Sequence, residues 1–416
     1  MQPDDLSILI ICPRAHFKGH FWNSTKDIAN ALTKKGVLYH IVMLTAENMK
    51  TDPIYMPHTT CVFKKTPFWF RAINPATTKQ QYKSLQSFEH FWDLALSSFV
   101  CSIRAFFMLK HRKYSGVYFS DGFSPISILF ALLRHTVVLH QCCTSYFLPN
   151  SGLKQKILSL MQRWLTFQAL KTNRIYFIFE NKHTQENDSV NGLGKSAVHI
   201  PEAITVQDVL PEKKACRRCL NIKEDQVIFL FFGAHRLSKD YDTAFNAARQ
   251  IFPSPCLLFA GPVVDNNPQI IAKKYNYNSV LFFNQFVPHE DVKYYFCASD
   301  VVVLPYVPGT NDIGGSSVFF LACQYNRPVI TTYSPFFNDL FAHYDVGFQY
   351  HNANVKKLAQ CMRNFLEMNS DKKKQIETGL DRIRRDFSWD NMIAKYLDIL
   401  KVPLKTLEKP ICNEQS

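Results

Sequence analysis

The chain has 416 residues, 47% of them hydrophobic, which is enough to bury the cores of two or three domains. Its formal net charge is +14. Residues 1–200 carry 23 Lys and Arg against 11 Asp and Glu, whereas residues 201–416 carry 25 against 23. We therefore expect the first half to face an anionic partner, such as a membrane surface or a phosphorylated substrate. Nucleic acid is disfavoured, because no recognition signature is present and the basic residues are dispersed.

The cysteine pattern disfavours disulfides and metal binding. The 12 cysteines follow no regular spacing, and several lie in apolar segments, as Cys12, Cys256 and Cys323 do. This arrangement is typical of free, buried thiols in a reducing compartment. One Cys-x-x-Cys begins at Cys216, but no second pair follows at zinc spacing, so a zinc or redox site is disfavoured.

No targeting or spanning segment is predicted. Residues 1–5 are polar and acidic, which is unlike a signal peptide, and no apolar run reaches the roughly 18 residues that span a bilayer. We therefore expect a cytoplasmic protein, with the inner face of the membrane as a further option for its location.

The first half alternates strands and helices. Residues 6–12 are an apolar strand, and the loop after it contains Gly19. A helix is predicted from an Asn23 or Ser24 cap to a stop at Gly36. The loop lacks the full dinucleotide glycine fingerprint, so a nicotinamide cofactor is not expected. Further strands are predicted at residues 37–44, 116–119, 136–140, 174–180 and 198–201.

His140 ends one of these predicted strands, at the edge where α/β sheets build their sites. An ordinary loop histidine is the alternative interpretation.

A basic aromatic segment interrupts this alternation. Phe68, Trp69 and Phe70 lie between basic residues at 64–65 and 71. One hypothesis is insertion at a membrane interface, with the aromatic rings at headgroup depth and the cations on anionic lipid. The other is a buried loop or a domain contact. The helical pattern at residues 79–113 leaves two similar options, a helix on a bilayer or a core helix with a solvated end.

Residues 202–225 are charged and lack clear periodicity, which predicts a hinge. From residue 227 the alternation of strands and helices begins again, so we predict two doubly wound domains facing each other. In the second domain, residues 301–304 are an apolar strand, and a glycine-rich loop leads to Gly315. Ser316 or Ser317 can cap the helix that follows. A capped helix N-terminus behind such a loop is typical of an anion site, although an ordinary strand–loop–helix turn has the same pattern.

Four stretches of the second half follow one another in a distinctive order. The first is residues 231–242, a loop with glycine, arginine and lysine. Residues 286–300 and 304–330 follow, and residues 387–389 begin the last helix. In this order they resemble the phosphate loop, base-binding segment, donor helix and crossover helix of the retaining nucleotide-sugar glycosyltransferases of the GT-B fold, family 4 and its relatives.

The resemblance implies an α/β fold of two facing Rossmann-like doubly wound domains (GT-B), with a C-terminal helix that crosses back to the first domain. It implies a metal-independent hexosyltransferase without a cofactor, which moves a sugar from a nucleotide-sugar donor to a glycan or lipid-linked acceptor in surface polysaccharide or glycoconjugate synthesis, with retention. The parts it implies are an N-terminal acceptor-binding domain at 1–203, a hinge at 204–225, a C-terminal nucleotide-sugar-binding domain at 226–386, a crossover helix at 387–401 and a tail at 402–416.

The same resemblance implies a set of site residues. Arg236 and Lys239 would offset the charge of the leaving diphosphate, and His140 would position the donor sugar. The residues it implies for donor binding are Gly19, Gly233, Phe286, Val287, Tyr306, Asp312, Gly315, Ser316 and Ser317.

Two departures from the family pattern keep other functions open. The family's Glu-x7-Glu pair falls on Ile313 and Leu321, so both acids are missing, and Ala234 occupies the commonest position of the phosphate-loop arginine. A Ser-Gly variant at the helix start also lacks the acids, and residues 315–317 resemble it. The alternative is a catalytically inactive homologue that binds nucleotide or acts as a scaffold. A nucleotide-sugar epimerase would need clustered acid–base residues, which the sequence does not indicate.

Overall fold

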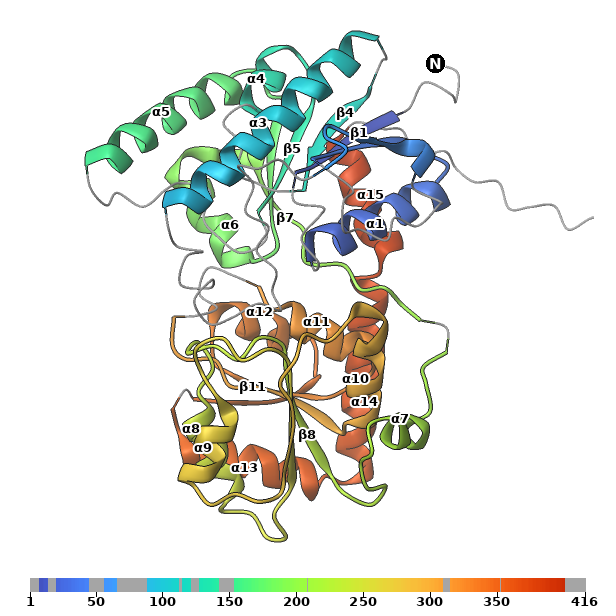
Figure 1. The fold of residues 1–416 in the computed structure, drawn as a ribbon, viewed down its shortest axis with the longest axis vertical. Helices are drawn as coiled ribbons and strands as arrows, with labels where there is room; N and C mark the ends of the chain where they lie inside the picture. The colour runs from blue at the N-terminus through green and yellow to red at the C-terminus, as the bar shows by residue number, and fades with distance from the viewer. Residues whose placement is uncertain are drawn as a thin grey trace, which may run out of the picture.

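The protein consists of two lobes that lie one above the other in Figure 1. The first half of the chain forms the upper lobe, and most of the second half forms the lower lobe. The computed structural model describes residues 7–13, 20–44, 56–65, 88–111, 114–120, 127–141, 153–207, 209–309, 315–351 and 353–400.

The first lobe is built on a parallel sheet with the order β3-β2-β1-β4-β5-β6-β7. Its strands are short and almost fully buried, because helices cover both faces of the sheet. The strands are β1 (Ser7–Cys12), β2 (Leu38–Met43), β3 (Thr59–Cys61), β4 (Gly116–Phe119), β5 (Val137–Gln141), β6 (Ile175–Phe179) and β7 (Ala197–His199). The helices of this part of the chain are α1 (His20–Lys34), α3 (Phe88–His111), α4 (Ser127–Leu132), α5 (Leu153–Leu170) and α6 (Lys182–Asp188).

Alternate residues of the strands point into two separate cores. Ile8 and Ile10 of β1 pack against α1 on one face, while Leu9 and Ile11 pack against α3 and α4 on the other. The alternation follows from the two-residue period of a strand. It explains why β1 shows no polar position within its buried run.

The second lobe repeats this plan with the strand order β10-β9-β8-β11-β12-β13, again all parallel. The strands are β8 (Ile228–Phe232), β9 (Cys256–Ala260), β10 (Val280–Phe283), β11 (Val301–Leu304), β12 (Val329–Thr332) and β13 (Gly347–Tyr350). The helices are α7 (Lys213–Cys219), α8 (Tyr241–Ala248), α9 (Pro268–Lys274), α10 (Val292–Ala298), α11 (Ser317–Gln324), α12 (Pro335–His343), α13 (Val355–Leu366) and α14 (Ser370–Asp386).

The last helix, α15 (Trp389–Ile399), returns to the first lobe and lies beside α1 (Figure 1). Met392, Tyr396 and Leu397 are buried in the same core as Ile8 and Ile10. The two chain segments that join the lobes run together, because the backbone N–H of Ile204 donates to the carbonyl of Phe387 at 2.7 Å. The predicted pair of doubly wound domains with a helix crossing back is therefore confirmed.

The segment predicted as a hinge contains helix α7, which packs on α10. Arg217 is buried and donates to the carboxylate of Asp300 at 2.9 Å and to the carbonyl of Ala298 at 2.9 Å. Asp300 also accepts from the backbone N–H of Ile228 at 2.8 Å. These bonds attach α7 firmly to the second lobe, so the connection itself shortens to the residues before α7.

Two further predictions differ from the structure. Helix α1 begins at His20, three residues before the predicted Asn23 cap. Trp22, in this first turn, is buried in the core, and its packing stabilises the additional helical residues. Strand β3 was not predicted, since it is only three residues long and half-buried. No helix in the described part of the chain is both long and apolar enough to span a membrane.

Candidate active site

The carboxyl ends of β8 and β9 meet in a pair of closely packed glycines. Gly233 follows β8 with a φ of +87°, and Gly261 follows β9 with a φ of +145°. A β-carbon on Gly261 would collide with the backbone of Gly233, so the two loops can approach this closely only with glycine at position 261. This packing keeps the loop after β8 close to the sheet.

Lys239 bends back from this loop so that its ammonium lies at the end of β8. Nζ donates to the carbonyl of Phe232 at 2.7 Å, and the side chain is only 8% exposed. Burial, with a smaller contribution from the charge of Arg236, lowers the pKa of Lys239 from 10.5 to about 7. A lysine held in this way gains charge when an anion binds beside it. Arg236, in contrast, is exposed to solvent.

A neighbouring loop braces the residues between Gly233 and Lys239. The carbonyl of His235 accepts the backbone N–H of Val264 at 3.0 Å, and the amide Nδ2 of Asn266 donates to the carbonyl of Lys239 at 2.7 Å. His235 itself is fully buried, which lowers its pKa to about 3, with a further contribution from the charge of Lys239. It therefore supports the loop as a neutral side chain.

The structure brings the predicted phosphate loop and the predicted donor loop side by side. The backbone of Lys239 pairs with that of Tyr306 in an antiparallel bridge, and the N–H of Asp240 donates to the carbonyl of Pro305 at 2.6 Å. The hydroxyl of Tyr306 lies 3.1 Å from Oγ of Ser316. Ser316 is the N-cap of α11 and accepts the N–H of Phe319, as predicted for a capped helix start.

The N-terminus of α11 lies close to Lys239. A β-carbon built on Gly233 would be 3.6 Å from Cγ2 of Val318 in α11 and 3.7 Å from Nζ of Lys239. Ser317 is the first residue of α11, and Gly315 precedes its cap. The backbone N–H groups of a first helical turn have no partner within the helix, so an anion there meets both these groups and the lysine.

The predicted base-binding residues lie at the same edge of the second sheet. Phe286 and Val287 come three and four residues after the end of β10, whose last carbonyl, that of Phe283, accepts the N–H of Gly261 at 3.0 Å. Val287 is buried in the core, and Phe286 is half-buried. Of this pair, Phe286 is the one left with exposed surface to offer a ligand.

In the first lobe, His140 lies at the carboxyl end of β5 and is 5% exposed. Its Nδ1 is 2.6 Å from the hydroxyl of Tyr118, and the ring packs edge-on against Tyr396 of the crossover helix. Burial lowers the pKa of His140 to about 4, against a smaller opposing effect of Glu202. The imidazole is therefore neutral at pH 7, and α15 holds it in place.

Glu180 is a site residue that the sequence analysis missed. It follows β6, is 4% exposed, and places Oε1 3.1 Å from Nε2 of His140, although no hydrogen bond forms to Nε2 among the described residues. Its Oε2 would be 3.6 Å from a β-carbon on Gly315 of the second lobe. Only its position directly after a buried strand could have indicated it. His140, Glu180 and the start of α11 thus meet across the two lobes.

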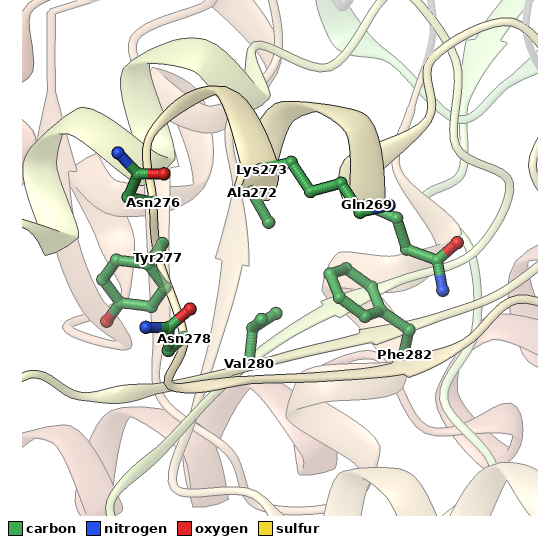
Figure 2. Close-up of a pocket in the computed structure, with 8 residues that line it drawn as sticks. All are labelled: Gln269, Ala272, Lys273, Asn276, Tyr277, Asn278, Val280 and Phe282. Atoms are coloured by element: carbon green, nitrogen blue, oxygen red, sulfur yellow. The ribbon is translucent and has the colours of Figure 1, made fainter.

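The two lobes also meet beside this point. A cavity of about 30 Å³ is lined by Glu180 and His199 from the first lobe and by Phe336 and Asp339 from the second. Lys182 of α6 forms an exposed ion pair with Asp339 of α12 at 3.3 Å. The larger groove in Figure 2, about 470 Å³, lies between α9 and β10, and among the described residues none of the predicted site residues lines it.

The spacing Asp240-x-Asp242 would suit a metal, but these carboxylates have other partners. Asp240 caps α8 by accepting from the N–H of Thr243 at 3.0 Å, and Asp242 accepts from the Tyr275 hydroxyl at 2.8 Å. Within the described ranges, no three His, Cys, Asp or Glu side chains are grouped to hold a metal ion.

Several predicted residues lie outside the described ranges. Gly19 and Asp312 of the donor site, and Phe68, Trp69 and Phe70 of the membrane hypothesis, belong to this group.

Comparison with known proteins identifies the fold. Residues 212–382 match the family described as Glycosyl transferases group 1. A glycosyltransferase from Rickettsia africae ESF-5 is 14% identical, with a TM-score of 0.70 over 97% of this chain and 100% of that one. Anabaena Alr3699/HepE, solved with UDP and glucose, is 14% identical, with a TM-score of 0.63 over 95% and 100%. WaaG, a glycosyltransferase involved in lipopolysaccharide biosynthesis, is 12% identical, with a TM-score of 0.59 over 96% and 100%.

The fold is therefore that of the two-domain GT-B glycosyltransferases, and the second domain carries the sequence match. No protein of curated function matches this sequence.

Proposed function

We propose that the protein is a retaining glycosyltransferase that transfers a sugar from a nucleoside-diphosphate sugar to a hydroxyl group of a glycan or a lipid-linked acceptor. The observation that carries this proposal is the meeting of Lys239, Gly233 and the N-terminus of α11 at one sheet edge. The similarity to HepE, solved with UDP and glucose, supports a nucleotide-sugar donor.

In the proposed reaction, the bond between the anomeric carbon and the β-phosphate oxygen breaks, and its electron pair leaves with the diphosphate. The charge that develops on the diphosphate is offset by the ammonium of Lys239, by Arg236 and by the N–H groups at the start of α11. These contacts strengthen as the bond breaks, so they lower the barrier as well as binding the donor.

The new bond forms on the same face of the sugar. The acceptor hydroxyl attacks the anomeric carbon and gives its proton to the departing phosphate oxygen. This route needs neither a carboxylate nucleophile nor a metal ion, and the predicted retention and metal independence both depend on it.

We assign the donor sugar to the space between the lobes at His140 and Glu180. The neutral imidazole can donate to or accept from a sugar hydroxyl, and the carboxylate of Glu180 lies beside Gly315 at the donor helix. Glu180 therefore takes the role of an acid that the donor helix lacks, since Ile313 and Leu321 stand where the family has glutamates.

The acceptor is assigned to the first domain, which carries most of the net positive charge. The similarity to WaaG supports an acceptor used in the synthesis of surface polysaccharides or glycoconjugates. An acceptor of this kind would place the protein at the cytoplasmic face of a membrane.

The test is turnover of a panel of nucleotide sugars, measured as release of nucleoside diphosphate with and without glycan or lipid-linked acceptors. The native protein is compared with Lys239→Ala and with a matched control, Lys274→Ala, whose side chain is 61% exposed. We expect the first substitution to abolish turnover and the second to leave it unchanged. Turnover that survives Lys239→Ala would contradict the site assignment, and an epimerised nucleotide sugar formed without acceptor would contradict transfer.

A second function, a catalytically inactive nucleotide-binding or scaffolding protein, is favoured by the two missing acids at Ile313 and Leu321. It would show no turnover with any donor, while nucleoside diphosphates would still raise the melting temperature of the native protein.

A further inference from the structure

Three helices form one layer on the outer side of the first domain. Their inner sides reach the same face of the sheet through Cys101 of α3, Ile128 of α4 and Ala169 of α5, which share one buried core. Figure 1 shows the three helices together on the upper lobe, away from the lower one. We call their outward sides the α3–α5 face.

The α3–α5 face is apolar where a solvent-facing surface is normally polar. Of the 20 exposed large hydrophobic side chains in the described part of the chain, nine lie on these helices and a tenth, Leu133, directly follows α4. Trp164 is 62% exposed and Leu160 is 66% exposed, and both lie on α5. Single exposed residues of this kind are ordinary, but a gathering of them marks a contact surface. The ten are Leu96, Phe99, Ile103, Phe107, Leu129, Leu132, Leu133, Leu160, Trp164 and Phe167.

On α3 these side chains form a stripe. Leu96, Phe99, Ile103 and Phe107 are spaced by three or four residues, so they lie along one side of the helix. The opposite side holds the buried Cys101 and Ala105. Helix α3 is therefore apolar on two sides, and only one of them has a partner in the described part of the molecule.

The same part of the chain is strongly basic. Residues 94–179 hold ten Lys and Arg but a single acidic residue, Asp121. The segments 96–111, 127–136 and 160–174, which carry the face, contain no Asp or Glu. The cations on these segments with exposed side chains are Arg104, Lys110, Arg134, Lys171 and Arg174.

From Leu96 of α3 to Arg174 beyond α5, the segments that carry this apolar face hold several cations and no acids, which matches an anionic lipid surface. We propose that the α3–α5 face docks on the surface of an anionic bilayer, with Leu160 and Trp164 inserted at headgroup depth and the cations on lipid phosphates. The proposal does not depend on the transfer reaction, because the face lies outside the donor site. It places the contact on α3, α4 and α5, and the membrane hypothesis for residues 68–70 stays a separate prediction.

The test is binding to sucrose-loaded vesicles, measured by sedimentation at about 0.05 M and about 0.5 M salt. The vesicles are phosphatidylcholine, with and without phosphatidylglycerol. We expect binding only to the anionic vesicles, and weaker binding at high salt. The double variant Leu160→Gln, Trp164→Gln should bind the anionic vesicles at least about ten-fold more weakly than the native protein. Each removed cation in Arg104→Gln, Lys171→Gln should cost roughly five-fold.

A matched control on the second domain is Ile270→Gln, Lys273→Gln, in which one exposed apolar and one exposed basic residue of α9 are replaced. It should bind as the native protein does. Circular dichroism and the thermal melting temperature establish that each variant is folded. The emission of Trp164 should shift to shorter wavelength on anionic vesicles, and Trp164→Phe should bind while losing that shift.

Three results would overturn the proposal. The first is a native protein that does not sediment with anionic vesicles at low salt. The second is undiminished binding by the Leu160→Gln, Trp164→Gln variant. The third is a dimer of the native protein in sedimentation velocity that the same substitutions dissociate, because the face would then be an interface between two copies of this chain. Vesicle binding and the oligomeric state do not require donor turnover. A protein without turnover would therefore contradict the proposed transfer reaction without contradicting the membrane contact.

Discussion

At the scale of single residues, two buried ionisable side chains define the candidate site. Lys239 lies beside the N-terminus of α11, and Glu180 of the other domain lies beside Gly315, just before that helix. Buried charged groups are costly unless a partner or a ligand compensates them. The place of Lys239 beside the start of α11 is best explained by a ligand that is itself anionic.

Glu180 should matter for transfer more than for nucleotide binding. Glu180→Gln keeps the size of the side chain but removes its charge beside Gly315 and His140. We expect kcat to fall roughly 10- to 100-fold, while affinity for the nucleoside diphosphate is kept or rises, because a negative charge near the N-terminus of α11 is lost. Steady-state kinetics and calorimetry measure the two effects. The control Glu186→Gln, at an exposed position of α6, should change neither. A parallel loss of binding and kcat would indicate a structural role instead.

Lys239 should make stability depend on pH. The folded protein lowers its pKa from 10.5 to about 7, so between these values the unfolded chain holds a proton that the folded chain has released. The free energy of unfolding therefore rises with pH across this window, and the destabilisation is complete at pH 7 and below. Lys239→Met should be more stable than the native protein by on the order of a few kcal/mol near pH 6. The advantage should shrink towards pH 9 in denaturant titrations. An advantage that is equal at both pH values would show that the ammonium is not desolvated.

At the scale of elements, helix α7 shows how a short helix can depend on distant residues. It has seven residues and no apolar period, so its sequence indicates no helix on its own. Its buried Arg217 bonds to Asp300, 83 residues later in the chain, and this contact exists only after the second sheet has formed. Strands such as β8 and β11, in contrast, are continuous apolar runs, so their own sequences predict buried strands.

Two adjacent arginines of α7 offer a matched comparison. Arg217 is 3% exposed and bonds to Asp300, whereas Arg218 is 66% exposed and pairs with the exposed Glu224. Arg217→Ala removes a buried hydrogen bond to Asp300, which still pairs with Lys213, so we expect a loss of about 1.5–3 kcal/mol in the free energy of unfolding. Arg218→Ala should change it by less than about 1 kcal/mol. Equal effects in urea titrations would contradict the account of how α7 is held.

The candidate site was predictable where it is local and unpredictable where it is not. Gly233, Lys239 and Ser316 each lie in a stretch whose spacing already indicates a loop or a helix start. Glu180 lies 40 residues from His140 and 135 from Gly315, and no spacing links the three. The pairing of β5 with β6 brings Glu180 to His140, and the contact between the two lobes brings Glu180 to Gly315. Neither contact is encoded in a local pattern.

At the scale of the whole molecule, the crossover helix joins the two domains into one unit. Leu397 and Tyr396 of α15 are buried in the core of the first domain, although the chain reaches them only after completing the second. Tyr396 also packs against His140. The orientation of a site residue in the first domain thus depends on the last helix of the chain.

Leu397→Ala should therefore weaken the first domain. It leaves a cavity in the core that contains Ile8 and Ile10, and we expect a loss of about 2–5 kcal/mol. The control is Asp398→Ala, because Asp398 is the exposed neighbour of Leu397. Hydrogen exchange followed by mass spectrometry should show faster exchange in β1 and β2 than in β8 and β9. Faster exchange confined to the second domain would contradict the described packing of α15.

In the proposed function, Lys239 and the N-terminus of α11 bind the diphosphate of the donor. The most direct measurement is calorimetric titration of a nucleoside diphosphate at pH 7 in two buffers of different ionisation enthalpy. Because the pKa of Lys239 is about 7 in the free protein and a bound anion raises it, about half a proton should be taken up per nucleotide bound. Lys239→Met should bind at least about 100-fold more weakly, without that uptake. Unchanged affinity in Lys239→Met, or binding of the native protein without proton uptake, would contradict the account.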